Sequence, residues 1–201
     1  MMEWTAFEDQ ARAEGYTCIC CIDEAGRGPL AGPVYAAAVV LRPGQVIEGV
    51  NDSKKLSEKK REALFDTICS QCAAYGIGSA TEKEIDEINI LNATYLAMQR
   101  AVAALPVQPD CALVDGNRAP DLPLEVRTII KGDAQSASIA AASILAKVSR
   151  DRYMLQMAEK YPQYAFEKHK GYGTKLHYER LEQYGISPIH RLSFLKKWMN
   201  R

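Results

Sequence analysis

The sequence predicts an α/β domain with a mixed sheet. Short apolar runs that end at glycine, proline or acidic residues indicate strands at 18–24, 34–41, 74–81, 111–114 and 124–130. The first two runs are separated only by a glycine- and proline-rich loop, which favours an antiparallel hairpin. Helical patterns separate most of the later strands, and this order of elements is typical of a mixed sheet with helices packed on it.

The helices are predicted from apolar side chains at helical spacing. One helix is expected to start at Ser57, and a second is expected from about Asn89 to Ala104, where Pro106 follows. A long alanine-rich pattern covers 134–160. Beyond it the sequence is helical and aromatic, so we expect a main domain at 1–160 and a helical extension at 161–201.

The composition limits the classes of partner and compartment. The chain has 201 residues, of which 47% are hydrophobic and 25% are charged, as in ordinary globular proteins. The formal net charge is zero, so any contact with nucleic acid must come from a local basic patch. No apolar run approaches 18 residues, and the N-terminus lacks a basic start and an apolar segment. We therefore expect a cytoplasmic protein without a transmembrane helix.

The six cysteines are expected to be free thiols in a reducing compartment. Cys18, Cys20, Cys21 and Cys111 lie in apolar runs, where cysteine behaves as a small hydrophobic residue. Cys69 and Cys72 have the spacing of a metal or redox pair. They lack a second pair or a nearby histidine, which favours a structural role over zinc or redox chemistry.

An acidic pair followed by a glycine turn is the most informative local feature. Asp23 and Glu24 end the first predicted strand, and Gly26-Arg27-Gly28 follows. A strand end holds acids rigidly, and glycines let a backbone approach a ligand closely. Together they suggest a metal site beside a phosphate-bearing substrate. Alone, each feature is equally compatible with a polar strand end and a tight turn.

Two more acids follow later strands, at Asp115 and Asp133. Neighbouring strands could bring them to the same sheet edge as Asp23 and Glu24. Carboxylate oxygens suit Mg²⁺ or Mn²⁺, and a crowded acidic cluster is costly without a cation. Spacing alone also allows Asp115 and Asp133 to be ordinary turn residues, because both adjoin glycine.

Beyond these patterns, the residues resemble a known family. Asp-Glu-Ala-Gly-Arg-Gly-Pro-Leu-Ala-Gly-Pro-Val at 23–34 is similar to the opening signature of the type 2 ribonucleases H, specifically bacterial ribonuclease HII. Further matching segments follow in the family's order, at 51–57, 88–94, 114–116, 131–133, 138–148, 150–151, 169–174 and 189–194. The resemblance spans 18–195, nearly the whole chain.

The resemblance implies a ribonuclease-H-like fold with a five-stranded sheet and a small C-terminal, substrate-binding helical extension. It implies cleavage of RNA in RNA–DNA hybrids and nicking 5′ of single ribonucleotides in duplex DNA, as in ribonucleotide excision repair and primer removal. The products would carry a 5′-phosphate and a 3′-hydroxyl. The cofactor would be Mg²⁺ or Mn²⁺, two ions acting together on water and the leaving oxygen.

The resemblance also assigns residues. By position, Asp23, Glu24, Asp115 and Asp133 match the four metal-binding carboxylates. Gly26, Arg27 and Gly28 match the loop whose backbone detects a ribose 2′-hydroxyl, the mark that separates RNA from DNA. Tyr172 matches the tyrosine that packs on the sugar at the RNA–DNA junction. Without the family motif, the glycines could simply make the turn and Tyr172 could be an ordinary half-buried residue.

Several basic residues are candidates for the local patch on the phosphate backbone: Lys54, Lys55, Lys147, Lys168 and Lys170. Lys147 is the strongest candidate, because it interrupts the alanine-rich helix. For each lysine, a solvated surface charge is the alternative.

Three other residues have open or structural assignments. Asp151 is either a fifth acid near the metals or part of an ion pair within Arg150-Asp151-Arg152. His190 and Arg191 are expected to support C-terminal packing.

The chain length indicates the subtype within the resemblance. Few residues precede Asp23 and few follow Phe194, which favours a self-sufficient monomer over forms with an extra domain or partner subunits. The rival hypotheses are another nuclease of the same broad fold, such as a Holliday-junction resolvase, and a binding module without activity. The glycine turn with Tyr172 argues against the first rival, and the complete set of acids argues against the second.

Overall fold

The computed structural model describes residues 4–200 and contains a five-stranded mixed sheet with the order β3-β2-β1-β4-β5. The strands are β1 (Ile19–Ala25), β2 (Val34–Val40), β3 (Ala74–Ala80), β4 (Cys111–Asp115) and β5 (Glu125–Ile129). The predicted strands and the predicted hairpin of β1 with β2 are confirmed. β2 lies between β1 and β3 and is antiparallel to both, whereas β4 and β5 extend the sheet in parallel from β1.

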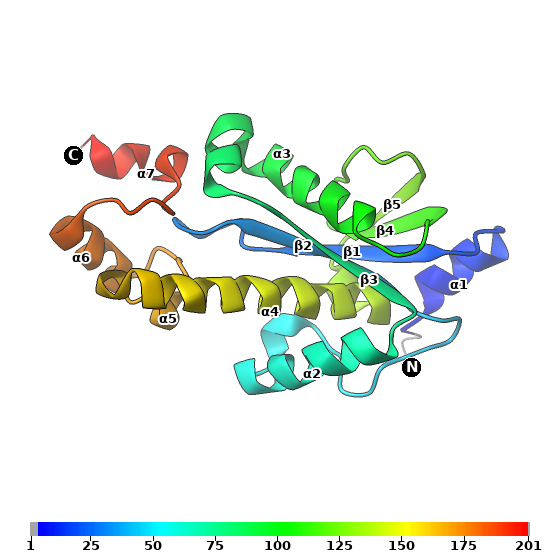
Figure 1. Ribbon diagram of the computed structural model, residues 1–201. Helices are drawn as coiled ribbons and strands as arrows, with labels where there is room; N and C mark the ends of the chain where they lie inside the picture. The colour runs from blue at the N-terminus through cyan, green and yellow to red at the C-terminus, as the bar shows by residue number, and fades with distance from the viewer. Residues whose placement is uncertain (1–3, 201) are drawn as a thin grey trace.

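Helices cover both faces of this sheet (Figure 1). They are α1 (Ala6–Ala13), α2 (Glu58–Gln71), α3 (Glu82–Ala103), α4 (Ala137–Lys160), α5 (Phe166–His169), α6 (Lys175–Tyr184) and α7 (Leu192–Met199). The described residues also form three short 3-10 turns, η1 (Ser53–Lys55), η2 (Gly132–Ala134) and η3 (Pro162–Tyr164). Among residues 4–200, no helix combines the length and apolar character that crossing a membrane requires.

The predicted helix start near Asn89 was wrong. α3 begins at Glu82, because Thr81 and Glu84 form a reciprocal capping box at its N-terminus. Asn89 itself is not helical, with φ 68°, and it marks a kink inside α3. Its side-chain oxygen accepts hydrogen bonds from the N–H groups of Leu91 and Asn92. The sequence pattern therefore detected the second half of the helix and its internal cap.

The two layers of the core follow the alternation of side chains along β1. Cys20 and Ile22 pack on one face with residues of α3, while Ile19 and Cys21 pack on the other face near α1 and α4. α2 also packs on the α4 side, through Leu64 and Ile68. All six cysteines are free thiols, and burial raises the pKa of Cys20 to about 12.

The C-terminal segment is tied to the loop between β1 and β2. The backbone N–H of Leu30 donates to the carbonyl of Gly171, and the N–H of Arg191 donates to the carbonyl of Leu30. Ala31 and His190 form an isolated β-bridge. Figure 1 shows α5, α6 and α7 gathered at one end of the sheet. These contacts hold the chain beyond Tyr161 against the glycine turn that follows Asp23 and Glu24.

Candidate active site

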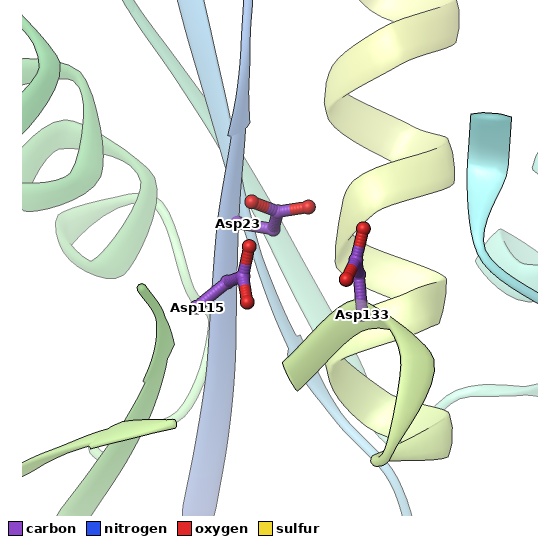
Figure 2. Close-up of side chains that lie close together, drawn as sticks. All are labelled: Asp23, Asp115 and Asp133. Carbon is purple, nitrogen blue, oxygen red and sulfur yellow. The ribbon is translucent and has the colours of Figure 1, made fainter. Parts of the chain in front are cut away.

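Three acidic side chains come together at one edge of the sheet. Asp23 lies near the end of β1, Asp115 is the last residue of β4, and Asp133 lies in η2 after β5. Because β1 and β4 are parallel neighbours, their carboxyl ends meet. One carboxylate oxygen from each residue lies within 4.8 Å of the other two, and Figure 2 shows the three groups converging. The fold thus assembles three of the four carboxylates that the sequence singled out.

Glu24 lies beside this cluster but faces the other layer. Consecutive residues of a strand point to opposite sides of a sheet. Asp23 faces Ser143 of α4, whereas Glu24 lines a groove with Thr94 and Met98 of α3. Glu24 also lines the same cavity as Asp23, so its carboxylate stands at the boundary between the two sides.

The pKa values of Asp23, Glu24 and Asp115 are raised, first by burial and then by neighbouring carboxylates. Burial raises the pKa of Asp23 well above its ordinary value, and the charges of Glu24 and Asp115 raise it further. The pKa of Asp115 is raised by burial and by the charge of Asp133. The pKa of Glu24 is raised by burial, with Arg27 opposing the shift. Like charges in a desolvated site are costly, and a bound cation would offset that cost.

The donor set fits a hard divalent cation. The converging ligand atoms are all carboxylate oxygens, which are the ligands that Mg²⁺ and Mn²⁺ prefer. The ammonium group of Lys54 lies 3.0 Å from an oxygen of Asp133 and neutralises part of the negative charge. The backbone N–H of Gly132 donates to Asp115, which fixes the orientation of that carboxylate.

A cavity of about 290 Å³ opens beside the cluster. It is lined by Asp23, Glu24, Ala25, Gly26, Arg27, Gly28, Ser53, Lys54, Arg61, Asp115, Ser143, Lys147 and Tyr172. Most of the residues that the sequence proposed for metal and substrate binding therefore border one cavity. Asp133, Lys55, Lys168 and Lys170 are not among its lining residues.

The glycine turn is shaped by a buried arginine from α4. Gly26 has φ +98°, a conformation that side chains rarely adopt. A Cβ atom on Gly26 would collide with the side chain of Arg150. Arg150 is itself fully buried and donates to the carbonyls of Ala31, Pro33 and Lys170. The absence of a side chain at position 26 thus allows the turn and Arg150 to pack together.

A second buried arginine fixes the direction of the peptides in this turn. Arg191 donates to the carbonyl oxygens of Gly26, Arg27 and Gly32, at 2.6, 3.0 and 2.8 Å. The peptides are trans, so each C=O points opposite to the N–H of the same unit. The N–H groups of Arg27 and Gly28 therefore point away from Arg191. Neither donates to an acceptor within residues 4–200, so both are available to a ligand.

Tyr172 stands beside the glycine turn. A Cβ atom on Gly28 would lie 3.8 Å from Cε1 of Tyr172. The cationic groups of Lys147 and Arg150 lie 6.0 and 5.8 Å from the centre of its ring. The tyrosine is 43% exposed, so an open aromatic surface borders the cavity. The turn and Tyr172 are far apart in the chain, and the C-terminal segment brings them together.

The lysines differ in their availability. The side chain of Lys54 is 78% exposed, and it lines the cavity together with Lys147. Lys147 forms a 2.7 Å ion pair with Asp151, and burial lowers its pKa. Lys170 is occupied, because it donates to the carbonyl of Glu167 and lies 3.7 Å from Glu58. Lys55 and Lys168 are exposed.

Asp151 is neither a fifth acid of the cluster nor paired with Arg150 or Arg152, the two alternatives that the sequence left open. Asp151 is buried and pairs with Lys147 rather than with its neighbours in the chain. Arg150 donates only to backbone carbonyls, and Arg152 pairs with Glu62. Asp151 is also absent from the acidic cluster. It therefore supports Lys147, one helical turn away on α4.

Sequence reasoning missed several residues around the cavity. Ser53 and Ser143 share a 2.8 Å hydrogen bond beneath it, and Arg61 donates to the carbonyls of Ser53 and Leu56. Ser143 had a usable signal, because it is a polar residue on the buried face of an alanine-rich helix. Arg61 had none, since its position in α2 matches an ordinary polar helix face.

Comparison with known proteins identifies the family. A family model described as Ribonuclease HII matches residues 20–197. A ribonuclease HII from Caldicellulosiruptor bescii is 59% identical, over 94% of this chain and 92% of the relative. A ribonuclease HII from Marinomonas sp. is 62% identical, over 86% of this chain and 87% of the relative.

Solved structures agree with the sequence comparison. The crystal structure of ribonuclease H2 from Pyrococcus horikoshii matches with a TM-score of 0.73 and 30% identity, over 88% of this chain and 93% of that one. RNase HII in its complex with PCNA from Archaeoglobus fulgidus matches with a TM-score of 0.68 and 28% identity, over 88% and 94%. The ribonuclease-H-like fold is therefore confirmed, and the chain belongs to the ribonuclease HII family, the type 2 ribonucleases H.

Proposed function

We propose that this ribonuclease H cleaves the RNA strand of RNA–DNA hybrids and nicks duplex DNA on the 5′ side of single embedded ribonucleotides. The products carry a 5′-phosphate and a 3′-hydroxyl, as ribonucleotide excision repair and primer removal require. One observation carries the proposal: Asp23 and Asp115 of the acidic cluster, the glycine turn and Tyr172 all border a single cavity. This shared cavity supports a site in which cleavage and ribose recognition act on the same part of the substrate.

The acidic cluster is proposed to hold two Mg²⁺ or Mn²⁺ ions through Asp23, Asp115 and Asp133, with Glu24 at its side. When bound, such ions lower the pKa of an attacking water and stabilise the leaving 3′-oxygen of a phosphodiester. The chain's own contribution is to hold the carboxylates close together and oriented. Gly132 fixes Asp115, and Lys54 fixes Asp133.

The glycine turn is proposed to select ribose. The free N–H groups of Arg27 and Gly28 are donors that match a 2′-hydroxyl, which deoxyribose lacks. With no Cβ at Gly28, a sugar can approach the backbone closely. Arg191 aims both donors before the substrate arrives, and such preorganisation reduces the ordering cost of binding.

Tyr172 is proposed to recognise the next sugar. Its exposed ring beside Gly28 offers a flat apolar surface that suits a deoxyribose and would clash with an added hydroxyl. The glycine turn and Tyr172 together would then favour a ribonucleotide that is followed by a deoxyribonucleotide. This arrangement supports cutting at RNA–DNA junctions.

The phosphate backbone is proposed to contact Arg27, Lys54 and Lys147, which line the cavity, with Lys55 and Lys170 at its margin. These contacts supply affinity that does not depend on base sequence. Residues 161–201 act as the substrate-binding extension, since Tyr172 and Arg191 come from this segment. We further propose a monomer that works in the cytoplasm, where its six thiols stay reduced.

The test uses one end-labelled DNA duplex with a single ribonucleotide, an all-DNA duplex and a uniform hybrid, each with Mg²⁺ or Mn²⁺. We expect a metal-dependent cut 5′ of the ribonucleotide, no cut in all-DNA, and loss of cutting in Asp23→Asn and Asp133→Asn with binding retained. Near-normal cleavage by either variant would contradict the metal assignment. A cut at another position would contradict the ribose-sensing turn.

A further inference from the structure

All three histidines of the chain lie together beneath Tyr172, and the proposed chemistry uses none of them. His169 ends α5, His177 lies in α6, and His190 precedes α7. Each ring is buried. The rings of His169 and His177 stack with centres 4.3 Å apart, and His190 lies 5.1 Å from His177. The hydrogen bonds that such a cluster can make depend on which nitrogen of each ring carries a proton.

The hydrogen bonds of His177 and His190 determine which nitrogen of each ring carries the proton. The backbone N–H of Ser187 donates to Nδ1 of His190, so that nitrogen carries no proton. In the neutral ring the proton is then on Nε2, which donates to Nε2 of His177 over 2.9 Å. His177 must therefore carry its proton on Nδ1, which donates to the carbonyl of Tyr172 over 2.9 Å.

Both rings of this pair are neutral. A charged His177 would set its Nε2–H against the Nε2–H of His190, and a charged His190 would set its Nδ1–H against the backbone N–H of Ser187. Burial lowers the pKa of His177 to about 4 and that of His190 to about 3. The chain of hydrogen bonds thus runs in one direction, from Ser187 to Tyr172.

His169 holds the same turn from the other side. Its Nδ1 accepts from the N–H of Gly171, and its carbonyl accepts from the N–H of Tyr172. Its other nitrogen therefore donates to the carbonyl of Tyr164, at 3.0 Å. The carbonyl of Tyr172 thus accepts from His177 and from the backbone N–H of Thr174, and its N–H donates to the carbonyl of His169.

The turn needs this support. Lys170 and Gly171 both have positive φ, at 49° and 86°, and the left-handed conformation is unfavourable for lysine. The ring of Tyr172 is itself partly exposed, so its position depends on the backbone more than on packing. A shift of that backbone would move the ring away from Gly28.

We propose that His177 is a positioning residue for Tyr172: its Nδ1–H bond to the Tyr172 carbonyl, relayed from His190, sets the ring for junction recognition. The inference rests on the proposed role of Tyr172. It assigns to His177 a task in substrate selection rather than in catalysis.

Two substitutions at His177 each keep one of its side-chain hydrogen bonds, to Tyr172 or to His190, and remove the other. The amide nitrogen of asparagine takes the place of Nδ1, so His177→Asn keeps a donor for Tyr172 and loses the link to His190. The longer glutamine reaches the place of Nε2, so His177→Gln keeps an acceptor for His190 and loses the donor to Tyr172. A purely structural role predicts that His177→Asn is the more damaging, because it leaves the buried His190 donor unpaired.

The measured quantity is junction preference, the kcat/KM for duplex DNA with one ribonucleotide divided by the kcat/KM for a uniform hybrid. We expect His177→Gln to lower this preference about tenfold and His177→Asn to stay within about threefold of wild type. Thermal unfolding should rank the two variants in the opposite order. Equal loss of preference in both variants, or greater loss in His177→Asn, would overturn the inference.

Tyr172→Ala in the same assay separates this inference from the proposed function. Unchanged preference in Tyr172→Ala would refute the role of Tyr172. Loss in Tyr172→Ala but not in His177→Gln would refute the positioning role alone.

A measurement on the wild-type protein needs no variant to fold. Long-range ¹H–¹⁵N NMR at neutral pH should show His177 protonated on Nδ1, and His169 and His190 protonated on Nε2. A His177 ring protonated on Nε2 or carrying a charge would overturn the proposal.

Discussion

Nη2 of Arg191 lies 2.6 Å from the carbonyl oxygen of Gly26, which joins the C-terminal segment to the turn after the first two acids. Arg191 is fully buried, and its hydrogen bonds go to backbone carbonyls rather than to a carboxylate. Its guanidinium therefore works as a rigid template for the turn. Because the planar fork fixes several carbonyls at once, it also fixes the N–H groups on the opposite side of the same peptides.

The first prediction concerns this template. Arg191→Lys keeps the charge but loses the fork, so the carbonyls of Gly26, Arg27 and Gly32 cannot all be satisfied. We expect kcat/KM on a single-ribonucleotide duplex to fall by about 10- to 100-fold. The free energy of unfolding should fall by about 2–4 kcal/mol. Arg152→Lys is the control on a half-buried ion pair with Glu62, and a similar effect there would refute a specific role for Arg191.

The second prediction concerns the glycine that makes room for Arg150. Gly26→Ala combines a strained φ with a collision against the Arg150 side chain. Gly15→Ala has the same kind of strain, at φ +106°, but nothing within 4 Å of the new Cβ atom. We expect Gly15→Ala to cost about 1–2 kcal/mol of stability with normal cleavage. Gly26→Ala should cost more and should lose ribose-dependent cutting, as denaturant unfolding and the nicking assay would show.

Equal stability loss and equal cleavage in the two alanine variants would mean that the backbone conformation matters and the packing against Arg150 does not.

The sheet was predictable because its strands are apolar and bounded by turn residues, and the acids were predictable because they follow those strands. That Asp23 and Glu24 face opposite sides of the sheet was not predicted from the sequence, although the alternation of side chains along a strand requires it. Arg191 was expected only to support packing, since nothing in a linear pattern shows that it reaches Gly26. The two residues are 165 positions apart in the chain.

The start of α3 was missed for a different reason. Thr81 and Glu84 have the spacing of a capping box, yet the apolar periodicity used to place the helix becomes clear only after Asn89. The left-handed Asn89 then mimics a helix start, since its side chain caps the following turn. A capping motif can thus occur both at the start of a helix and at a kink inside it. Apolar periodicity alone places the helix start at the inner motif.

The third prediction follows from the raised pKa values of the acids. Between the ordinary carboxyl pKa and the raised pKa of Asp23, the folded protein binds more protons than the unfolded chain. The stabilising contribution of this group is present at low pH and is lost as pH rises through the folded pKa. In metal-free buffer, Asp23→Asn should therefore be more stable than wild type at neutral pH, although we expect it to lose activity.

The measurement is the melting temperature of both proteins from pH 4 to pH 8, with EDTA. The advantage of Asp23→Asn should grow with pH, at about 2–4 °C for each kcal/mol. Adding Mg²⁺ or Mn²⁺ should raise the melting temperature of wild type and reduce this difference. A difference that is independent of pH and metal would show that Asp23 carries no destabilising charge.

The last prediction concerns Lys54, whose side chain is 78% exposed beside Asp133. If Lys54 binds a phosphate, Lys54→Gln should weaken hybrid binding and lower the salt dependence of log Kd by about 0.9 for each phosphate interaction that is removed. Binding is measured by fluorescence anisotropy in an Asp23→Asn background, so that the substrate stays intact. Lys83→Gln is the matched control, because Lys83 is equally exposed on α3 and lies outside the cavity. Equal slopes for the two variants would restrict Lys54 to orienting Asp133, and phosphate binding would then rest on Arg27 and Lys147.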